Sequence, residues 1–540
     1  MVPWGDEMKS SADLVAEGLA KAGVRHLFGY IAGPNARLIE ALHGSPVEFV
    51  AVAHEGSAGF MADVSSRLTG RVGACLSTLG PGATNMTTGV GNASLDRVPL
   101  LAITAQVGRL WKGRTTQMHI DHRRLYSPIS KWSAELETGK IGATMEKAVE
   151  VATAEQPGPV HLDFPEDTAE ELSDEPPAAR PAASPPLPPV DRKALERAAA
   201  LIKKARYPLV AVGLTMNRAQ ATGELREFVG KHRLPVVTTL MAKGQVPEGG
   251  PELVGVLGRA RREIVAEYCA PADLIIAVGY DPVELNYEEW MRKEIPLIHI
   301  DTVPADIAGE YSVACQLVGD IRETLKALLS IPELSHHWDL EALPAHRRRL
   351  HRALTPRQKR FSPHQAVLAM RQILPADGLL CVDVGAHTHL IGQLWRAAGP
   401  GCFLVSNGWS SMGFAIPAAI AAKLARPGRP VLACVGDGGF LMSVGEINTA
   451  VRLGLPVVIV LLRDNTLSLI KAKQARHGYH FDGVGLFGPG YRSSDNFFGA
   501  RVIVAEREED FREALKRGLS GSEPVVIEAV VDPAEYDRIL

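Results

Sequence analysis

The stretch CVGDGGFLMSVGEINTAVRLGLPVVIVLLRDN, residues 434–465, contains two apolar runs, and each run ends in a polar turn. The first run ends in Gly-Asp-Gly around Asp437, and the second ends at Asp464. The sequence SVGEINTAVRLGL between them has the length and spacing of a helix. An apolar strand, a helix and a second apolar strand are typical of a parallel sheet that is covered on both faces. The stretch therefore predicts an α/β fold.

The two polar turns predict a binding site. Parallel strands end at one edge of their sheet, and the 27-residue spacing from Asp437 to Asp464 is what one strand-helix-strand unit requires. The two carboxylates, with the carbonyl of Thr466, would give oxygen ligands for Mg²⁺ bridging to a diphosphate. A tight turn with a helix cap explains Gly-Asp-Gly alone, but not the second turn at this spacing. Three residues would let the diphosphate approach the backbone amides: Gly436, Gly438 and Gly439.

Short apolar runs alternate with amphipathic helices along most of the chain. This alternation predicts three consecutive doubly wound parallel-sheet domains, at residues 1–168, 190–332 and 360–540. Residues 166–191 are dense in Pro, Ala and acidic side chains, which predicts a semi-rigid linker. Residues 336–363 are polar and rich in His and Arg. An anion site is one interpretation of that basic run, and a solvated helix face is the simpler one.

The composition excludes several classes of protein. A chain of 540 residues is too long for one core. Its 58 basic and 61 acidic residues give a net charge of −3 without long single-sign blocks, so a nucleic-acid groove or a basic membrane face is not indicated. No apolar stretch is long enough to span a bilayer, and the N-terminus has no signal core. The six cysteines include no C-x-x-C pair, so we expect buried thiols in a cytoplasmic protein.

The Gly-Asp-Gly turn and the later polar pair resemble the diphosphate and Mg²⁺ signature of thiamine diphosphate (ThDP) enzymes. The commoner pattern ends in Asn-Asn where this chain has Arg463-Asp464, and aspartate there also occurs in the acetolactate synthase branch. Residues 49–107 closely resemble the pyrimidine-binding domain of the acetolactate synthase and pyruvate oxidase group. The resemblance makes Glu55 the glutamate that hydrogen-bonds N1′ of the aminopyrimidine. That bond favours the imino tautomer, whose 4′-nitrogen removes the C2 proton of the thiazolium.

Residues 405–424 resemble the segment that bends ThDP into its V shape. The resemblance implies that Met412 lies under the two rings of ThDP, although core packing also explains a methionine there. It implies that the Ser410 carbonyl accepts a hydrogen bond from the 4′-amino group. By the same resemblance, His387 in CVDVGAHTH is a diphosphate contact.

Residues 272–328 resemble the catabolic, FAD-independent acetolactate synthases, which carry a similar Gly-Tyr-Asp-Pro-Val-Glu run. The Arg-Phe-Asp-Asp-Arg segment of the biosynthetic FAD-containing enzymes is missing, and residues 190–330 contain no G-x-G-x-x-G loop, so we expect no functional FAD. The family order is pyrimidine-binding, central and diphosphate-binding domain, with active sites between subunits. The resemblance thus implies a homodimer or homotetramer, in which Glu55 of one chain serves the ThDP held by Asp437 of another.

The loop before YSPISK differs from the family pattern, in which Phe-Gln or His-Gln lies near the reacting carbonyl. Gln117 and Met118 take that place here, and His119 and His122 follow. Because imidazole titrates near neutral pH, these histidines are candidates to exchange protons with a carbinol intermediate. A surface loop with two solvated histidines is the alternative. Leu467 is a candidate pocket residue, and core packing explains it equally well.

The leading hypothesis is a ThDP- and Mg²⁺-dependent enzyme that decarboxylates a pyruvate-like 2-oxo acid and ligates the product to a second carbonyl. The alternative within the class is a non-oxidative 2-oxo acid decarboxylase or a 2-hydroxyketone lyase. A flavin-dependent oxidase of the same family is a third reading. A non-catalytic ThDP-fold regulator is the hypothesis from another class, and the joint presence of Glu55, Asp437 and Asp464 argues against it.

Overall fold

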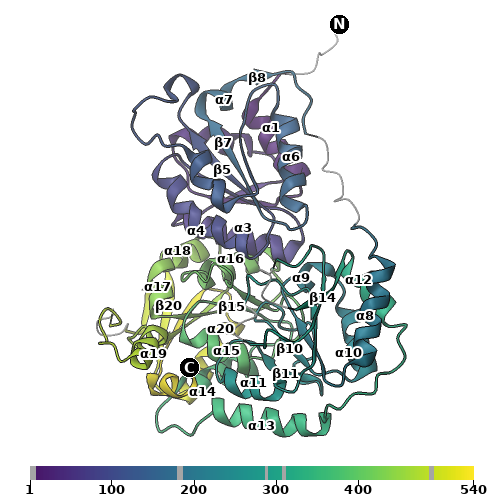
Figure 1. Cartoon of the computed structure of the whole chain (residues 1–540). Coiled ribbons are helices and arrows are strands. Elements are labelled where there is room, and N and C mark those ends of the chain that lie inside the picture. Colours follow the sequence, from purple (N-terminus) through teal and green to yellow (C-terminus); the bar gives the residue numbers. More distant parts are fainter. Residues whose placement is uncertain (1–7, 179–186, 286–289, 307–311, 486–491) are drawn as a thin grey trace. The chain divides into compact units, whose positions relative to one another are not determined.

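The computed structural model describes residues 8–178, 187–285, 290–306, 312–485 and 492–540 (Figure 1). Within them the chain forms two compact units. The first unit comprises residues 1–185, 408–428 and 443–455, and the second comprises residues 186–407, 429–442 and 456–540. Three larger sheets, each wholly or mostly parallel, are present in the described residues, which confirms the predicted fold class.

The first unit is built on a six-stranded sheet of order β3-β2-β4-β5-β7-β6, in which all neighbours are parallel. Helices α1 (Ser11–Lys21) and α6 (Ile141–Thr153) pack on one face of this sheet (Figure 1), and their buried side chains share a core with those of the strands. Helix α3 (Glu55–Thr69) packs on α4 (Pro81–Leu95) and on α16 (Ala415–Ala425). The strands are β2 (His26–Gly29), β3 (Glu48–Ala51), β4 (Gly73–Ser77), β5 (Leu100–Gln106), β6 (Trp132–Glu135) and β7 (Pro159–Pro165).

The second unit contains the two other large sheets, and the first of these is wholly parallel with the order β11-β10-β9-β12-β13-β14. One face packs against α8 (Arg192–Lys204), α10 (Thr222–His232) and α12 (Ile321–Leu328). The other face packs against α11 (Arg262–Cys269) and α13 (Leu343–Leu354). The strands are β9 (Pro208–Val212), β10 (Val236–Thr238), β11 (Leu253–Val256), β12 (Leu274–Val278), β13 (Leu297–Asp301) and β14 (Val313–Val318).

The other sheet of this unit has the order β16-β15-β17-β18-β21-β20-β19, and only the β19–β20 pair is antiparallel. Its strands are β15 (Leu379–Val382), β16 (Phe403–Val405), β17 (Val431–Gly436), β18 (Val458–Arg463), β19 (Ser494–Phe497), β20 (Ala500–Ala505) and β21 (Val525–Val530). Its helices include α14 (Pro363–Ile373), α15 (Ala386–Leu394), α17 (Asp437–Ser443), α19 (Ser468–His477) and α20 (Glu508–Ser520). Helix α18 (Glu446–Arg452), which follows α17, belongs to the first unit.

Part of the predicted linker is ordered secondary structure, so that prediction was wrong for residues 166–173. Helix α7 (Glu166–Glu170) begins after Pro165, because two acidic side chains in its first turn suit the positive end of the helix dipole. Strand β8 (Leu172–Ser173) then pairs with β1 (Lys9–Ser10), which leads into α1. Residues 179–186 of the predicted linker lie outside the described residues.

All six cysteines are buried and free, which confirms the prediction of buried thiols. Among the residues that the structure describes, no helix is both long enough and apolar enough to cross a membrane.

Candidate active site

The β15–β21 sheet has its topological switch point between β15 and β17, because the chain leaves β15 towards β16 and leaves β17 towards β18. Crevices at such points, outside the carboxyl ends of the strands, bind ligands in open α/β sheets. Three aspartates follow the carboxyl ends of these strands: Asp383 after β15, Asp437 after β17 and Asp464 after β18. The geometry of the fold therefore brings the two predicted metal ligands to one edge.

Asp437 and Asp464 are joined through backbone hydrogen bonds. Asp437 Oδ2 accepts from the N–H groups of Asp464 at 3.0 Å and Asn465 at 2.8 Å. Asp464 accepts from the Thr466 N–H at 2.9 Å and from the Ser468 hydroxyl at 2.7 Å. Burial and the neighbouring Asp464 raise the pKa of Asp437 to about 7, and burial raises the pKa of Asp464. Two neighbouring carboxyl groups whose pKa values are both raised, chiefly by burial, form a pair that a divalent cation would neutralise.

The predicted diphosphate contacts surround this pair. A Cβ at Gly439 would lie 2.3 Å from Asp383 Oδ1 and would clash, whereas a Cβ at Gly436 would lie 3.2 Å from the His387 ring, a tight contact. Gly438 lies in the first turn of α17. His387 is buried, and its Nε2 has no hydrogen-bond partner in the described part of the chain. Burial lowers the pKa of His387 to about 4. An unpaired buried nitrogen beside a glycine-rich helix start fits an anionic ligand.

Glu55 is the first residue of α3 and its side chain is buried. Its Oε2 accepts a hydrogen bond from Asn85 Nδ2 at 3.0 Å. The turn after β4 lies against this carboxylate, since a Cβ at Gly82 would be 3.2 Å from Glu55 Oε1 and 2.8 Å from Thr78 Cγ2. The carboxyl group is thus oriented in a confined space by one amide donor and a glycine turn.

The loop after β5 reaches the same glycine turn. Gly80 has φ +61°, and a Cβ there would be 2.6 Å from the Met118 carbonyl oxygen. The Gly80 N–H donates to His122 Nε2 at 3.2 Å. Gln117 and Met118 are exposed, and Met118 itself has φ +62°. The predicted substrate loop and Glu55 therefore lie against the same short segment, residues 80–82, at the start of α4.

The two histidines of this loop have different surroundings. His119 is half-buried, and its Nδ1 lies 2.9 Å from Gln106 Oε1. His122 is fully buried, and its Nδ1 lies 3.0 Å from Asp163 Oδ1. Because the Gly80 N–H already donates to Nε2, the ring proton of His122 is placed on Nδ1, facing Asp163. His122 is therefore bonded at both ring nitrogens.

Asp163 connects these groups. Its Oδ1 accepts from the Thr104 hydroxyl at 2.9 Å, and its Oδ2 lies 3.3 Å from Gln106 Nε2. Burial opposes ionisation of Asp163, but hydrogen bonds from His122 and Thr104 outweigh it and lower the pKa of the carboxyl. Sequence reasoning missed Thr104, Gln106 and Asp163. The sequence signal that could have identified them is a polar residue at every second position of β5 and β7, two otherwise apolar strands.

Comparison with known proteins agrees with this geometry. Three family models match the chain: the N-terminal thiamine pyrophosphate (TPP) binding domain of TPP enzymes at residues 9–125, their central domain at 195–328 and their C-terminal TPP binding domain at 383–529. The acetolactate synthase of Bacillus subtilis (strain 168) is 30% identical over 96% of this chain and 93% of that protein. The chain belongs to the family of thiamine diphosphate enzymes.

Two further relatives of this ThDP enzyme cover nearly its whole length. The probable acetolactate synthase large subunit of Methanocaldococcus jannaschii is 30% identical over 97% of this chain and 92% of that protein. The acetolactate synthase of Mycobacterium bovis is 31% identical over 97% of this chain and 88% of that protein.

The segment of the ThDP enzyme that carries Ser410 and Met412 lies in the first unit, against α4. The Gly408 N–H donates to Asp96 Oδ1 at 2.7 Å. Ser410 has φ +50°, and Met412 is half-buried. The segment is anchored at its start, and its two candidate cofactor contacts follow in a tight turn that leads into α16.

The remaining candidates lie after β18. The N–H of Thr466 donates to Asp464, and its carbonyl, the predicted metal ligand, accepts from the Ser468 N–H at 2.9 Å. Leu467 is half-buried, and its N–H donates to the Val484 carbonyl at 2.9 Å. Helix α19 begins at the next residue. Among the described residues, no group of three or more His, Cys, Asp or Glu side chains is arranged to hold a metal ion.

In the central domain, the sheet edge that usually receives a ligand is filled by a side chain. The switch point lies between β9 and β12. Glu284 Oε2 accepts from the Leu214 N–H at 2.7 Å, and its Oε1 accepts from the Thr239 hydroxyl at 2.5 Å. A Cβ at Gly213 would be 2.5 Å from Tyr280 Cα and 2.7 Å from Glu284 Oε2. A buried carboxylate thus takes the donors that a phosphate would use.

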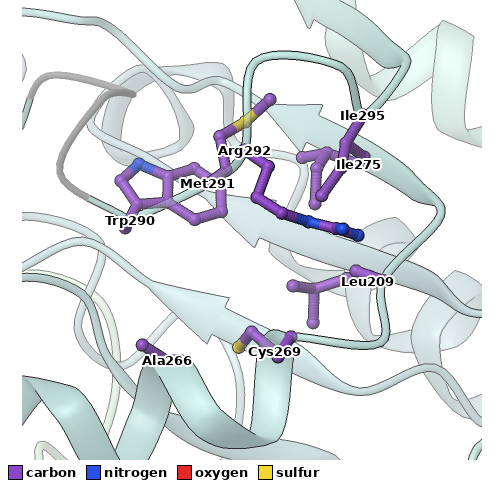
Figure 2. Close-up of a pocket in the computed structure, with 10 residues that line it drawn as sticks. Leu209, Ala266, Cys269, Ile275, Trp290, Met291, Arg292 and Ile295 are labelled. Atoms are coloured by element: carbon purple, nitrogen blue, oxygen red, sulfur yellow. The ribbon is translucent and has the colours of Figure 1, made fainter.

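A separate cavity of about 370 Å³ lies on the α11 side of the same sheet (Figure 2). Leu209 and Ile275 contribute from near the amino ends of β9 and β12, and Arg292 extends along it in Figure 2. Burial raises the pKa of Cys269, which also lines the cavity, to about 12, so this thiol is not a reactive group. The cavity is mostly apolar and is not at the switch-point edge of the sheet.

Proposed function

We propose that this enzyme decarboxylates a pyruvate-like 2-oxo acid and ligates the remaining carbon unit to a second carbonyl compound. Its nearly full-length relatives are acetolactate synthases, which supports this proposal. The observation that carries it is the placement of Glu55, buried and oriented by Asn85, against the turn that also contacts the Met118 loop. A buried carboxyl group in this confined position, beside an exposed loop that carries a histidine, is placed as a functional group would be.

ThDP and Mg²⁺ are the proposed cofactors. Asp437, Asp464 and the Thr466 carbonyl would bind Mg²⁺. The amides of Gly436, Gly438 and Gly439, with His387, would bind the diphosphate, and Ser410 and Met412 would contact the pyrimidine side. When bound, ThDP supplies the nucleophilic carbon and accepts the electron pair released by decarboxylation. Glu55 would share its proton with the pyrimidine nitrogen and so set the tautomer of the ring.

His119 is the proposed acid–base group for the reacting carbonyl. Its Nδ1 contact with Gln106 would fix the ring and leave Nε2 directed away from that bond. His122 has both nitrogens engaged, so we now assign it a positioning role at the Gly80 turn in place of direct proton exchange with the substrate. Gln117, Met118 and Leu467 would line the substrate pocket.

We propose that the central domain binds no flavin, because Glu284 occupies the donors at its switch point. Purified enzyme should show no absorbance near the flavin band. Addition of FAD should not shift the melting temperature. A yellow protein that releases FAD on denaturation would overturn this part of the proposal.

The enzyme is proposed to be a cytoplasmic homodimer or homotetramer with active sites shared between chains, and with the three domains at 1–168, 190–332 and 360–540. The sharing can be tested with two inactive variants, Glu55→Gln and Asp437→Asn. If each site takes Glu55 from one chain and Asp437 from another, unfolding and refolding a mixture should restore part of the activity. Each variant refolded alone is the control. No recovery from the mixture, with hybrids demonstrated by mass spectrometry, would contradict shared sites.

The reaction itself is tested by incubating the enzyme with pyruvate, ThDP and Mg²⁺ and identifying the products by NMR. Acetolactate is the expected product, and its loss in Glu55→Gln ties it to this site. The second candidate function is a non-oxidative decarboxylase or 2-hydroxyketone lyase. It is favoured by Gln117-Met118, which stands where the synthases have Phe-Gln or His-Gln, and by His119 directly after this pair. Acetaldehyde, or cleavage of an added acyloin, would support that alternative and exclude the synthase assignment.

A further inference from the structure

The basic stretch at 336–363 includes helix α13, which has one apolar and one basic face. Leu343, Leu350 and Leu354 are buried against the central sheet. The residues at 347, 348, 351 and 352 form a stripe along the helix, since residues three and four apart share a face. The helix supports the interpretation of a solvated basic face. The residues around this stripe in the structure add a second feature, which the sequence alone does not predict.

The stripe lines a cavity of about 520 Å³ in the second unit. A further guanidinium, that of Arg396, enters it from the segment after α15. Four arginines and one histidine thus line one hollow from two elements that are distant in sequence, and all of them except Arg347 are exposed. The lining residues are Arg347, Arg348, His351, Arg352, Arg396, Pro344, Gly249 and Glu248.

The one carboxylate in this lining is already engaged. Glu248 Oε2 lies 2.8 Å from Lys243 Nζ, and its Oε1 accepts from the Gly244 N–H at 3.1 Å. Glu248 and Lys243 are both nearly fully buried, so this pair is an internal ion pair. Glu248 therefore cannot neutralise the four arginines.

The arginines of the cavity have little compensation of their own. In the described ranges, Arg348, Arg352 and Arg396 form no ion pair and no side-chain hydrogen bond. Arg347 donates to the Gly250 carbonyl. Burial and the nearby Arg396 lower the pKa of Arg347, and Glu252 offsets this only in part. Like charges gathered in one hollow repel each other, and an anion in the hollow would remove that repulsion.

We propose that this cavity binds a small polyanion carrying two or more phosphoryl or carboxylate groups, at a site separate from the ThDP site. Guanidinium groups match such groups with paired N–H donors. The volume lies within the range of small-molecule sites. The whole chain has a net charge of −3, so the cluster does not follow from a basic composition. The inference does not depend on which reaction the enzyme catalyses.

The same helix provides a matched control. Arg349 is adjacent to the stripe in sequence, but it pairs with Glu267 at 2.5 Å and does not line the cavity. Arg348→Ala and Arg349→Ala each remove one exposed arginine from α13. They differ in whether that arginine faces the cavity.

The test is calorimetric titration of the holoenzyme, with ThDP and Mg²⁺ saturating so that the diphosphate site is filled. Two probes are titrated separately: inorganic tripolyphosphate for phosphoryl groups and citrate for carboxylates. The concentration of free Mg²⁺ is kept constant. We expect one saturable site for at least one probe. Arg348→Ala and Arg396→Ala should each weaken it by about tenfold, and Arg349→Ala should leave it unchanged. Circular dichroism checks that each variant is folded.

The two probes distinguish the two classes of ligand. Binding of tripolyphosphate alone indicates a phosphorylated ligand, and binding of citrate alone indicates a polycarboxylate. The proposal is overturned if neither probe binds the wild-type holoenzyme. It is equally overturned if Arg349→Ala weakens binding as much as Arg348→Ala. A change of mass in sedimentation for Arg348→Ala or Arg396→Ala, without a change in probe affinity, would assign the cluster to a subunit contact and exclude the site.

Discussion

Replacing Asp437 by asparagine should stabilise the cofactor-free protein while removing its stabilisation by Mg²⁺ and ThDP. Asp437 is 7% exposed, and burial together with Asp464 raises its pKa from 3.8 to about 7. Asparagine has nearly the same shape, and its carbonyl can still accept from the N–H groups of Asp464 and Asn465. The substitution therefore removes a buried charge and keeps its hydrogen bonds.

The magnitude follows from the difference in proton binding. Between pH 3.8 and about 7 the unfolded chain has lost the Asp437 proton and the folded protein has kept it. The unfolded state then binds fewer protons, so the stability of the wild type falls as the pH rises, and the full penalty is present above the folded pKa. About three pKa units correspond to about 4 kcal/mol. We expect Asp437→Asn to be more stable by roughly 2–4 kcal/mol near pH 8 and by under about 1 kcal/mol near pH 4.

Urea unfolding in EDTA, followed by circular dichroism across this pH range, measures the difference. Asp377→Asn removes an exposed carboxylate and should change little. With Mg²⁺ and ThDP added, the wild type should gain stability and Asp437→Asn should not. The reasoning is refuted if the cofactor-free variant is the less stable protein near pH 8. It is also refuted if the difference does not shrink towards low pH.

Three further substitutions address the other groups. Glu55→Gln should keep the hydrogen bond from Asn85 and leave the free energy of unfolding unchanged, while steady-state kinetics should show kcat lowered by about 10²- to 10⁴-fold. An unchanged kcat would exclude a catalytic role. Asp163→Asn should lower the free energy of unfolding by about 1–3 kcal/mol and shift the pH–rate profile, because His122 then faces a neutral amide and the new NH2 group opposes the Gln106 donor. A loss of stability with an unshifted profile would leave a purely structural role. Glu284→Ala leaves two buried donors unpaired, and urea unfolding should show a free energy of unfolding lower by about 2 kcal/mol or more. An unchanged free energy of unfolding would contradict the conclusion that Glu284 fills the crevice of the central sheet.

The fold was predictable because the parallel strands are nearly continuous apolar runs. Runs such as LIIAV in β12 and VIVLLR in β18 are buried on both faces, which makes them distinct from the amphipathic helices. The edge strands β6, β14 and β19 contain no such continuous buried run. Half-exposed residues in such strands weaken the apolar signal. Their place depends on pairing with distant strands.

The candidate site was predictable only in part. The order of strands along the chain is enough to bring Asp437 and Asp464 to one edge, since consecutive parallel strands are commonly neighbours. The burial of His122 and the partners of His119 depend on Gln106 and Asp163, which come from other strands. A pattern of residue types cannot distinguish a solvated histidine from one held by such contacts. The same holds for Glu284, whose donors follow β9 and β10.

Asp437 and His387 are both mostly uncharged near pH 6.5 without a cofactor, so cofactor binding should move protons in two opposite directions. Near pH 6.5 the Asp437 pKa of about 7 leaves most of its carboxyl groups protonated, and a cation there must displace that proton. The buried His387 ring has a pKa lowered to about 4 and is neutral at this pH. An anion beside its unpaired Nε2 would raise that pKa and draw a proton in.

Calorimetry in buffers of different ionisation enthalpy can count these protons. Titration with Mg²⁺ alone near pH 6.5 should release up to about three-quarters of a proton, the protonated fraction of a group with pKa about 7. The release should vanish in Asp437→Asn and near pH 8.5. Adding ThDP afterwards should take up protons in the wild type and not in His387→Asn. Release of protons in the second step would mean that the diphosphate does not contact His387. An unchanged release in Asp437→Asn would place the cation elsewhere, so the two steps test the two halves of the site independently.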